Sequence, residues 1–146
     1  MADQTATSAI QTHLVKLTQQ LLDCIVAGDY ATYLRLCDDS LSCFEPEARG
    51  HIVLGLDFHK YYFDLKHRAA NATASGSASA PFQTTMASPH VRLLGDSVAV
   101  VSYIRLIQRL DAAQHPQTTA SEETRVWHKS PVTKEWKLVH FHRSAL

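Results

Sequence analysis

The chain lacks several features that would place it in a common functional class. It has 146 residues and no run of about 18 apolar residues, so no membrane-spanning helix is expected. Residues 1–8 lack the basic region and apolar run of a secretory signal. Fourteen basic and fourteen acidic residues balance, which argues against a dedicated nucleic-acid-binding domain. We therefore expect a cytoplasmic protein with neither a membrane nor a nucleic acid as its partner.

Glycine-rich phosphate loops are also missing, and cysteine is scarce. The five glycines form neither a G-x-G-x-x-G nor a Walker pattern, and no G-x-S-x-G nucleophile motif is present. Cys24, Cys37 and Cys43 lie in apolar-rich segments, which favours structural thiols in a reducing compartment. Asn71 stands in a glycosylation pattern, but the sequence has no secretory signal to make use of it. No cofactor is predicted.

Apolar periodicity predicts helices in the first half of the chain and strands in the second. The expected helices are residues 8–27, 30–37 and 56–67, and the expected strands are residues 41–45, 82–94, 97–110, 119–129 and 135–143. The strand over 82–94 should bend near Pro89, and residues 68–80, rich in Ala and Ser, should form a mobile surface loop. Helices followed by hairpin-connected strands describe an α+β domain, whose antiparallel sheet can curl round the long helix.

Capping residues and turn residues mark several boundaries. Thr7 or Ser8 can cap the first helix, Gly28 supplies its stop, and Asp29 can cap the second helix. Residues 38–40 read as a turn, and residues 50–55 are too short to classify. The apolar stripe of the first helix consists of Ile10, Leu14, Leu17, Leu21 and Ile25.

Three arginines, Arg105, Arg125 and Arg143, stand in predicted strand rows that are otherwise mostly apolar. A buried guanidinium is costly unless an anion meets it. Two interpretations stay open: carboxylates of the protein pair with the arginines, or the sheet lines a pocket for an anion. Glu123 is the natural internal partner, because residues two apart in a strand share a face and Glu123 therefore lies beside Arg125.

The same alternation leaves a third interpretation, in which the arginines are solvated. Trp127 and Phe141 share the faces of Arg125 and Arg143 and argue that this side of the sheet is buried. Regular alternation, however, puts Trp136 and Leu138 on the opposite face.

Histidines offer weaker signals. His59 could donate to an anion or act as a general base, although a hydrogen-bonded core histidine is the commoner case. His140 and His142 share a strand face and could ligate a metal. Because the sequence places no third ligand beside them, no metal site is predicted.

Several strings in the chain are specific enough to indicate a family. They are Gly28-Asp-Tyr30, Cys37-Asp38, Phe44-Glu-Pro-Glu-Ala48, Gly55-Leu-Asp-Phe-His59, Tyr61-Tyr-Phe63, Pro89-His90, Tyr103-Ile-Arg-Leu106, Ser121-Glu-Glu-Thr-Arg-Val-Trp-His128 and Val139-His-Phe-His-Arg-Ser144. Over about residues 10–144 the chain resembles the association domain, or hub, of calcium/calmodulin-dependent protein kinase type II.

The resemblance implies a fold and an assembly. The fold is the cone-shaped α+β architecture of nuclear transport factor 2 (NTF2) and ketosteroid isomerase, here as one domain over residues 9–146 after a short flexible segment over 1–8. The implied function is non-catalytic: a closed homo-oligomer of roughly 12 to 18 subunits in two stacked rings. Such a ring scaffolds kinase domains for calmodulin-dependent signalling, so kinase-bearing hub subunits are possible partners.

The resemblance also implies a cavity that binds small carboxylates or acidic peptide groups through His59, Arg105, Arg125 and Arg143, with Tyr62, Tyr103 and Glu123 as further candidates. Two departures concern its lid: the family has a bulky aromatic residue in the loop after the third helix, where this chain has about His67, and the Ala/Ser-rich insert is longer than usual.

Two other functions are compatible with these residues. One is an NTF2-like enzyme of the isomerase or dehydratase type, with His59 or Asp57 as the base and the arginines stabilising an enolate-like anion. The other is a passive carboxylate-binding protein.

Overall fold

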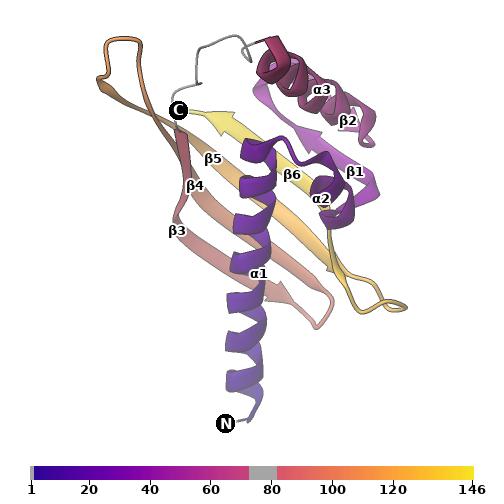
Figure 1. Cartoon of the computed structure of the whole chain (residues 1–146). Coiled ribbons are helices and arrows are strands. Elements are labelled where there is room, and N and C mark those ends of the chain that lie inside the picture. Colours follow the sequence, from indigo (N-terminus) through magenta and orange to yellow (C-terminus); the bar gives the residue numbers. More distant parts are fainter. Residues whose placement is uncertain (1, 73–81) are drawn as a thin grey trace.

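The computed structural model describes residues 2–72 and 82–146 as one layer of helices packed on a curved sheet (Figure 1). The helices are α1 (Ala2–Ala27), α2 (Tyr30–Leu36) and α3 (Asp57–Ala72), with a short 3-10 turn at Pro46–Ala48. The strands are β1 (Cys37–Phe44), β2 (Val53–Leu54), β3 (Phe82–Leu94), β4 (Val98–Leu110), β5 (Pro116–Lys129) and β6 (Trp136–Ala145). The predicted α+β class and the order of its elements are confirmed.

The sheet runs in the order β2-β1-β6-β5-β4-β3. The strands from β3 to β6 pair antiparallel, as their hairpin connections predict, and β1 pairs antiparallel with β2. β1 and β6, however, pair in parallel. These two strands come from opposite ends of the chain, so no hairpin signal in the sequence could indicate their pairing.

α1 crosses one face of the sheet, and its N-terminal turns extend beyond the strands (Figure 1). The predicted apolar stripe is confirmed: Leu14 and Leu21 are fully buried, and Ile10, Leu17 and Ile25 pack against the core. Thr18 is buried among them, and its hydroxyl is not left without a partner, because its Oγ1 donates to the carbonyl of Leu14 at 2.8 Å.

The predicted caps are present around the α1–α2 junction. Gly28 has φ +72°, a left-handed conformation that glycine adopts without strain, and so ends α1. The Asp29 carboxylate accepts the backbone N–H of Thr32 at 3.0 Å and caps α2.

Several boundaries differ from the prediction. α1 begins at Ala2 rather than Ser8, a difference in geometry that leaves the predicted flexibility of residues 1–8 untested. Residues 38–40 belong to β1, where Asp38 accepts the N–H of Ser40 within an irregular stretch between Cys37 and Ser42. Val53 and Leu54 of the unclassified segment form β2.

α3 continues to Ala72, so the expected loop over 68–80 is wrong for residues 68–72. The rest of that predicted loop lies outside the described residues. His67, expected near a loop, is an exposed residue of α3. Alanine is a strong helix former, which explains why an Ala-rich segment extends the helix.

Two bulges decide which side chains lie on the buried face of the sheet. β3 shifts register between Ala87 and His90, where Ser88 has φ 50°, and this confirms the bend predicted near Pro89. In β6 the partners pass from His140 directly to Leu138, so Val139 is an extra residue.

The bulge at Val139 corrects the predicted alternation in β6. Trp136 and Leu138, expected on the face opposite Phe141, are buried together with Phe141. One residue inserted into a strand reverses the alternation beyond it, because side-chain direction has a period of two. The arginine face is therefore the buried face along the whole of β6.

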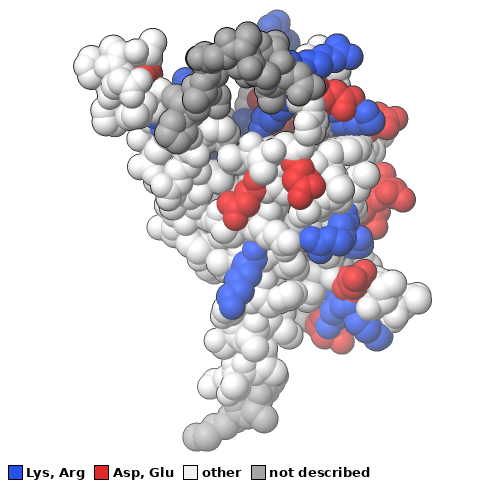
Figure 2. All heavy atoms as spheres, in the orientation of Figure 1, with Lys and Arg blue, Asp and Glu red and all other residues white. Residues whose placement is uncertain are grey.

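No helix within residues 2–72 and 82–146 combines the length and the apolar character needed to cross a membrane. The face shown in Figure 2 carries both Lys or Arg and Asp or Glu side chains, gathered mainly in the middle and on the right of the view. The visible surface thus has no extended patch of a single sign, in keeping with a net charge of zero.

Candidate functional site

The four residues of the predicted anion pocket line one cavity of about 270 Å³. His59 comes from α3, Arg105 from β4, Arg125 from β5 and Arg143 from β6. The predicted Tyr62 also lines it. The complete lining is Ile25, Tyr33, Glu45, Glu47, His59, Tyr62, Phe63, Lys66, Arg105, Ile107, Arg125, Phe141 and Arg143.

Glu123 neutralises the deepest positive charge. Its Oε2 accepts from Arg125 Nη2 at 2.8 Å and from the Tyr103 hydroxyl at 2.6 Å, and its Oε1 lies 3.7 Å from Arg105 Nη1. Arg125 Nε donates to the Tyr103 oxygen at 2.7 Å, which closes a ring of hydrogen bonds. Tyr103 and Glu123 therefore hold the pocket arginines in place rather than lining the cavity.

The charges of this network shift the pKa values of its members. Burial alone would raise the pKa of Glu123, but Arg125, the Tyr103 hydroxyl and Arg105 lower it below its usual value. Burial raises the pKa of Tyr103 to about 12. The pKa of Arg105 is lowered by burial, yet a guanidinium remains charged at any relevant pH.

Arg143 is paired with carboxylates that the alternation argument did not find. Its Nη2 contacts Glu47, and it lies 3.6 Å from Glu45 Oε2. The parallel register of β1 and β6 brings these groups together, since Phe44 pairs with His142 and the next residues are Glu45 and Arg143. The signal available in the sequence was the pair of glutamates flanking Pro46 at the end of a strand.

Of the two open interpretations of the arginines, internal pairing with carboxylates is confirmed, and the anion pocket stays a prediction. The three arginines face three carboxylates, Glu45, Glu47 and Glu123, so internal pairing is real. Two nitrogens of cavity-lining residues are nevertheless left over, because Arg125 Nη1 and His59 Nδ1 are buried without hydrogen-bond partners. The solvated interpretation is wrong for Arg105 and Arg125, which are 8% and 2% exposed.

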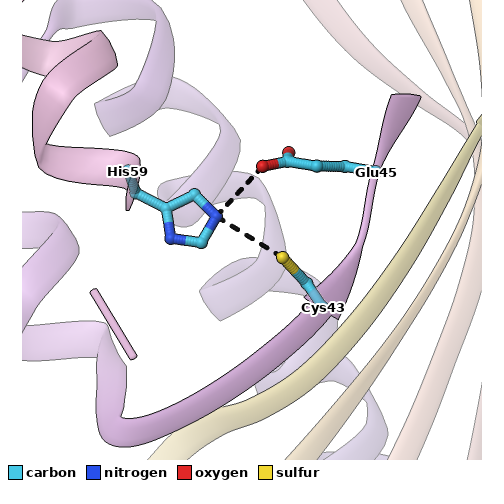
Figure 3. Close-up of side chains that lie close together, drawn as sticks. All are labelled: Cys43, Glu45 and His59. Carbon is cyan, nitrogen blue, oxygen red and sulfur yellow. Dashed lines mark hydrogen bonds and ion pairs between the residues drawn. The ribbon is translucent and has the colours of Figure 1, made fainter. Parts of the chain in front are cut away.

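His59 reaches the cavity wall from the first turn of α3 and meets two residues near the end of β1 (Figure 3). Its Nε2 lies 3.3 Å from Glu45 Oε1 and 3.5 Å from Cys43 Sγ. Burial, aided by Glu45, raises the pKa of Cys43 to about 12, so this thiol is protonated at neutral pH.

Lys66 is a cavity residue that the sequence analysis did not single out. It lies on α3 one turn beyond Tyr62 and Phe63, and its Nζ donates to the carbonyl of Ile25. Burial and the nearby Arg105 lower its pKa. The helical spacing from His59 was the signal that could have found it, since residues separated by about seven positions share a helix face.

Other candidates lie away from the cavity. Asp57, one of two possible bases for an enzyme, is exposed and does not line it. His140 Nδ1 lies 2.8 Å from Ser42 Oγ, and no third metal ligand joins His140 and His142 among the described residues. The three cysteines are buried free thiols, as predicted.

Comparison with known proteins identifies the family of the chain. A family model for the calcium/calmodulin dependent protein kinase II association domain matches residues 11–146. The calcium/calmodulin-dependent protein kinase type II alpha chain of Drosophila melanogaster is 44% identical over 138 residues, which cover 94% of this chain and 24% of the relative. This chain thus spans about a quarter of the length of the curated relatives it matches.

Solved structures place the fold. The CaMKII hub homology domain of Chlamydomonas reinhardtii is 48% identical with a TM-score of 0.76, over 91% of this chain and 95% of that one. An NTF2-like superfamily protein from Salmonella enterica is 20% identical with a TM-score of 0.65, over 95% of this chain and 92% of that one. The second likeness concerns the fold alone, and it confirms the predicted NTF2-like architecture.

Proposed function

Because the chain belongs to the calcium/calmodulin-dependent protein kinase II association domain family, we propose that it is an oligomerisation module that assembles copies of itself into a closed double ring. The family match over residues 11–146 is the observation that carries this proposal. The module itself is non-catalytic. Its use is to hold attached or co-assembled kinase domains at high effective concentration, so that reactions between them become nearly intramolecular.

Apolar side chains exposed at one end of the sheet support self-association. Large exposed apolar patches on a single chain mark surfaces that bind other proteins. In Figure 1 the elements α2, α3, β1 and β2 gather at the same end of the molecule. Exposed side chains on or beside them are Leu34, Phe44, Ile52, Leu54 and Leu65, between 39% and 72% exposed.

Native mass spectrometry with light scattering tests the assembly. We expect a discrete complex of roughly 12 to 18 chains, since rotational symmetry closes an assembly at a fixed number. Leu54→Glu should shift the mass to smaller species, because a charge would be buried in an apolar contact. Val132→Glu is the matched control: Val132 is 86% exposed and lies in the β5–β6 turn. A wild-type chain that is only monomeric or dimeric would contradict the proposal.

We also propose that the cavity binds small carboxylates or acidic peptide groups. The unpaired Arg125 Nη1 supports this, because a buried donor without a partner favours an incoming acceptor. A carboxylate that reached Arg143 would compete with Glu47 and Glu45 for its guanidinium. Binding is therefore weakened by the protein's own anions.

Calorimetry with short hydroxy acids tests this competition. Glu47→Gln should tighten binding and Arg143→Ala should weaken it, each by about 10-fold, since a hydrogen bond to a charged group contributes about 1.5 to 3 kcal/mol. Glu122→Gln, on the exposed face of β5, is the control and should change nothing. If Glu47→Gln and Glu122→Gln behave alike, Glu47 does not compete with the ligand. If Arg143→Ala also leaves binding unchanged, Arg143 takes no part in it.

Location and partners complete the proposal. Three buried free thiols suit the reducing cytoplasm, where we place the protein. Kinase-bearing hub subunits would be its partners, because they carry the same interfaces and can enter the same ring.

A further inference from the structure

A thiol, a carboxylate and an imidazole meet at the cavity wall (Figure 3). The donor atoms are Cys43 Sγ, Glu45 Oε1 and His59 Nε2, and all three lie within 4.8 Å of one another. The residue types are those that bind zinc in proteins: a cysteine sulfur, an imidazole nitrogen and a carboxylate oxygen. The Cys43 thiol would bind zinc as the thiolate and release its proton to solvent when the metal binds. The hydrogen bonds and ion pairs described above between the arginines and Glu123 do not involve the Cys43 thiol.

Local backbone geometry explains how the three side chains converge. Glu45 is extended, with φ −149° and ψ 153°, so it continues the alternation of β1 and shares a face with Cys43. His59 lies in the first turn of α3, and it is 16 residues further along the chain than Cys43. Sequence spacing alone does not show this meeting, because it depends on how α3 returns over the end of β1.

Burial leaves the carboxylate of this cluster incompletely satisfied. The Glu45 side chain is only 9% exposed, and its Oε1 has no hydrogen-bond partner although His59 Nε2 lies 3.3 Å away. Cys43 is fully buried and His59 is 7% exposed. A cation between the three donors would supply what the Glu45 oxygen lacks, since a buried unsatisfied acceptor costs free energy.

We propose that Cys43, Glu45 and His59 form a zinc-binding site with one coordination position open to the cavity. A tetrahedral zinc ion, with Zn–S of about 2.3 Å and Zn–N and Zn–O of about 2.0 to 2.2 Å, has S···N and N···O edges of about 3.6 and about 3.4 Å. The corresponding separations in this protein are 3.5 and 3.3 Å. Magnesium and calcium are excluded by the ligand types, because they prefer sets of oxygen ligands.

The open position would face the arginines. Glu45 and His59 line the cavity and the fully buried Cys43 does not, so the free side of the ion points into the cavity. Arg143 lies 3.6 Å from the second oxygen of Glu45, and its positive charge weakens cation binding. An anionic fourth ligand, either hydroxide or a small carboxylate, would offset that repulsion. The site depends neither on ring formation nor on carboxylate binding.

Cobalt and zinc titration of the intact, chelator-treated protein tests the site. We expect one equivalent of Co²⁺ per chain, with thiolate-to-cobalt charge-transfer absorption, and displacement of the cobalt by Zn²⁺. Cys43→Ala should abolish the absorption and weaken zinc binding by more than about 100-fold, because loss of even an outer-shell partner costs about 10- to 100-fold. Cys24→Ala removes another buried thiol and should leave both signals unchanged.

Two further variants keep the result interpretable. Glu45→Gln preserves side-chain size and should also weaken zinc binding, which covers the case in which Cys43→Ala disturbs folding. His140→Ala with His142→Ala removes the histidine pair that lies near Ser42 and Ser144. Loss of binding in that double variant alone would overturn the proposal, as would the absence of charge-transfer absorption from wild-type protein. Mass measurement of each variant tests the assembly separately.

Discussion

Glu123 is the counter-ion of the two most deeply buried arginines of the cavity. It is 2% exposed and contacts both Arg125 and Arg105. Glu123→Gln would leave two guanidiniums without their counter-ion. We expect a loss of about 3 to 5 kcal/mol in the free energy of unfolding, the usual effect of breaking a buried ion pair.

Urea unfolding measures this loss. Glu122→Gln is the matched control, because it makes the same change on the exposed side of β5 and should have an effect within about 0.5 kcal/mol. Equal stability of the two variants would show that Arg125 finds another anion.

Strand alternation predicted these residues well where the strands are regular. Alternation placed Arg125 and Glu123 on one face with Trp127, and that face is the buried one, because β4 and β5 pair without a break. Glu45 and Glu47 could not be assigned to Arg143, since their contact depends on a parallel pairing across most of the chain. Local sequence patterns predict the face of a strand on which each side chain lies. They do not predict which distant strand pairs with it.

Among the elements, α2 depends on its N-cap. It has only seven residues, and the Asp29 carboxylate supplies the acceptor for the N–H of Thr32. We expect Asp29→Ala to destabilise the protein by about 1 kcal/mol, because an N–H of the first turn loses its partner. Asp29→Asn keeps an acceptor oxygen and should retain most of the stability. Thermal unfolding of the two variants under identical conditions distinguishes them.

Helix starts and strand irregularities set the limit of prediction at the scale of elements. The sequence predicted three such features, because each has a local chemical cause: the apolar stripe of α1, the Asp29 cap and the bend near Pro89. The bulge at Val139 has no glycine or proline to mark it. It lies in a strand that pairs with β5 on one side and with β1 on the other.

For the whole molecule, the carboxylates of the cavity predict sensitivity to acid. The pKa of Glu123 in the folded protein is below its usual value of 4.5, so its stabilising contribution is present above that pH and is lost as the pH falls through the lowered pKa. We expect the melting temperature, at fixed protein concentration, to fall as the pH drops below about 4.5. In Glu123→Gln this part of the pH dependence should be smaller. An unchanged profile would mean that other groups control acid unfolding.

The position of β6 inside the sheet has a consequence for synthesis of the protein. β6 lies between β1 and β5, and the side chains of Ser42 and His140 that meet there are 98 residues apart. A ribosome therefore releases α1, β1 and β2 long before the strand that joins them to the other half exists. Non-local pairing of this kind slows folding. Until β6 emerges, the side of β1 that pairs with it has unpaired backbone N–H and C=O groups, which are a template for pairing with another chain.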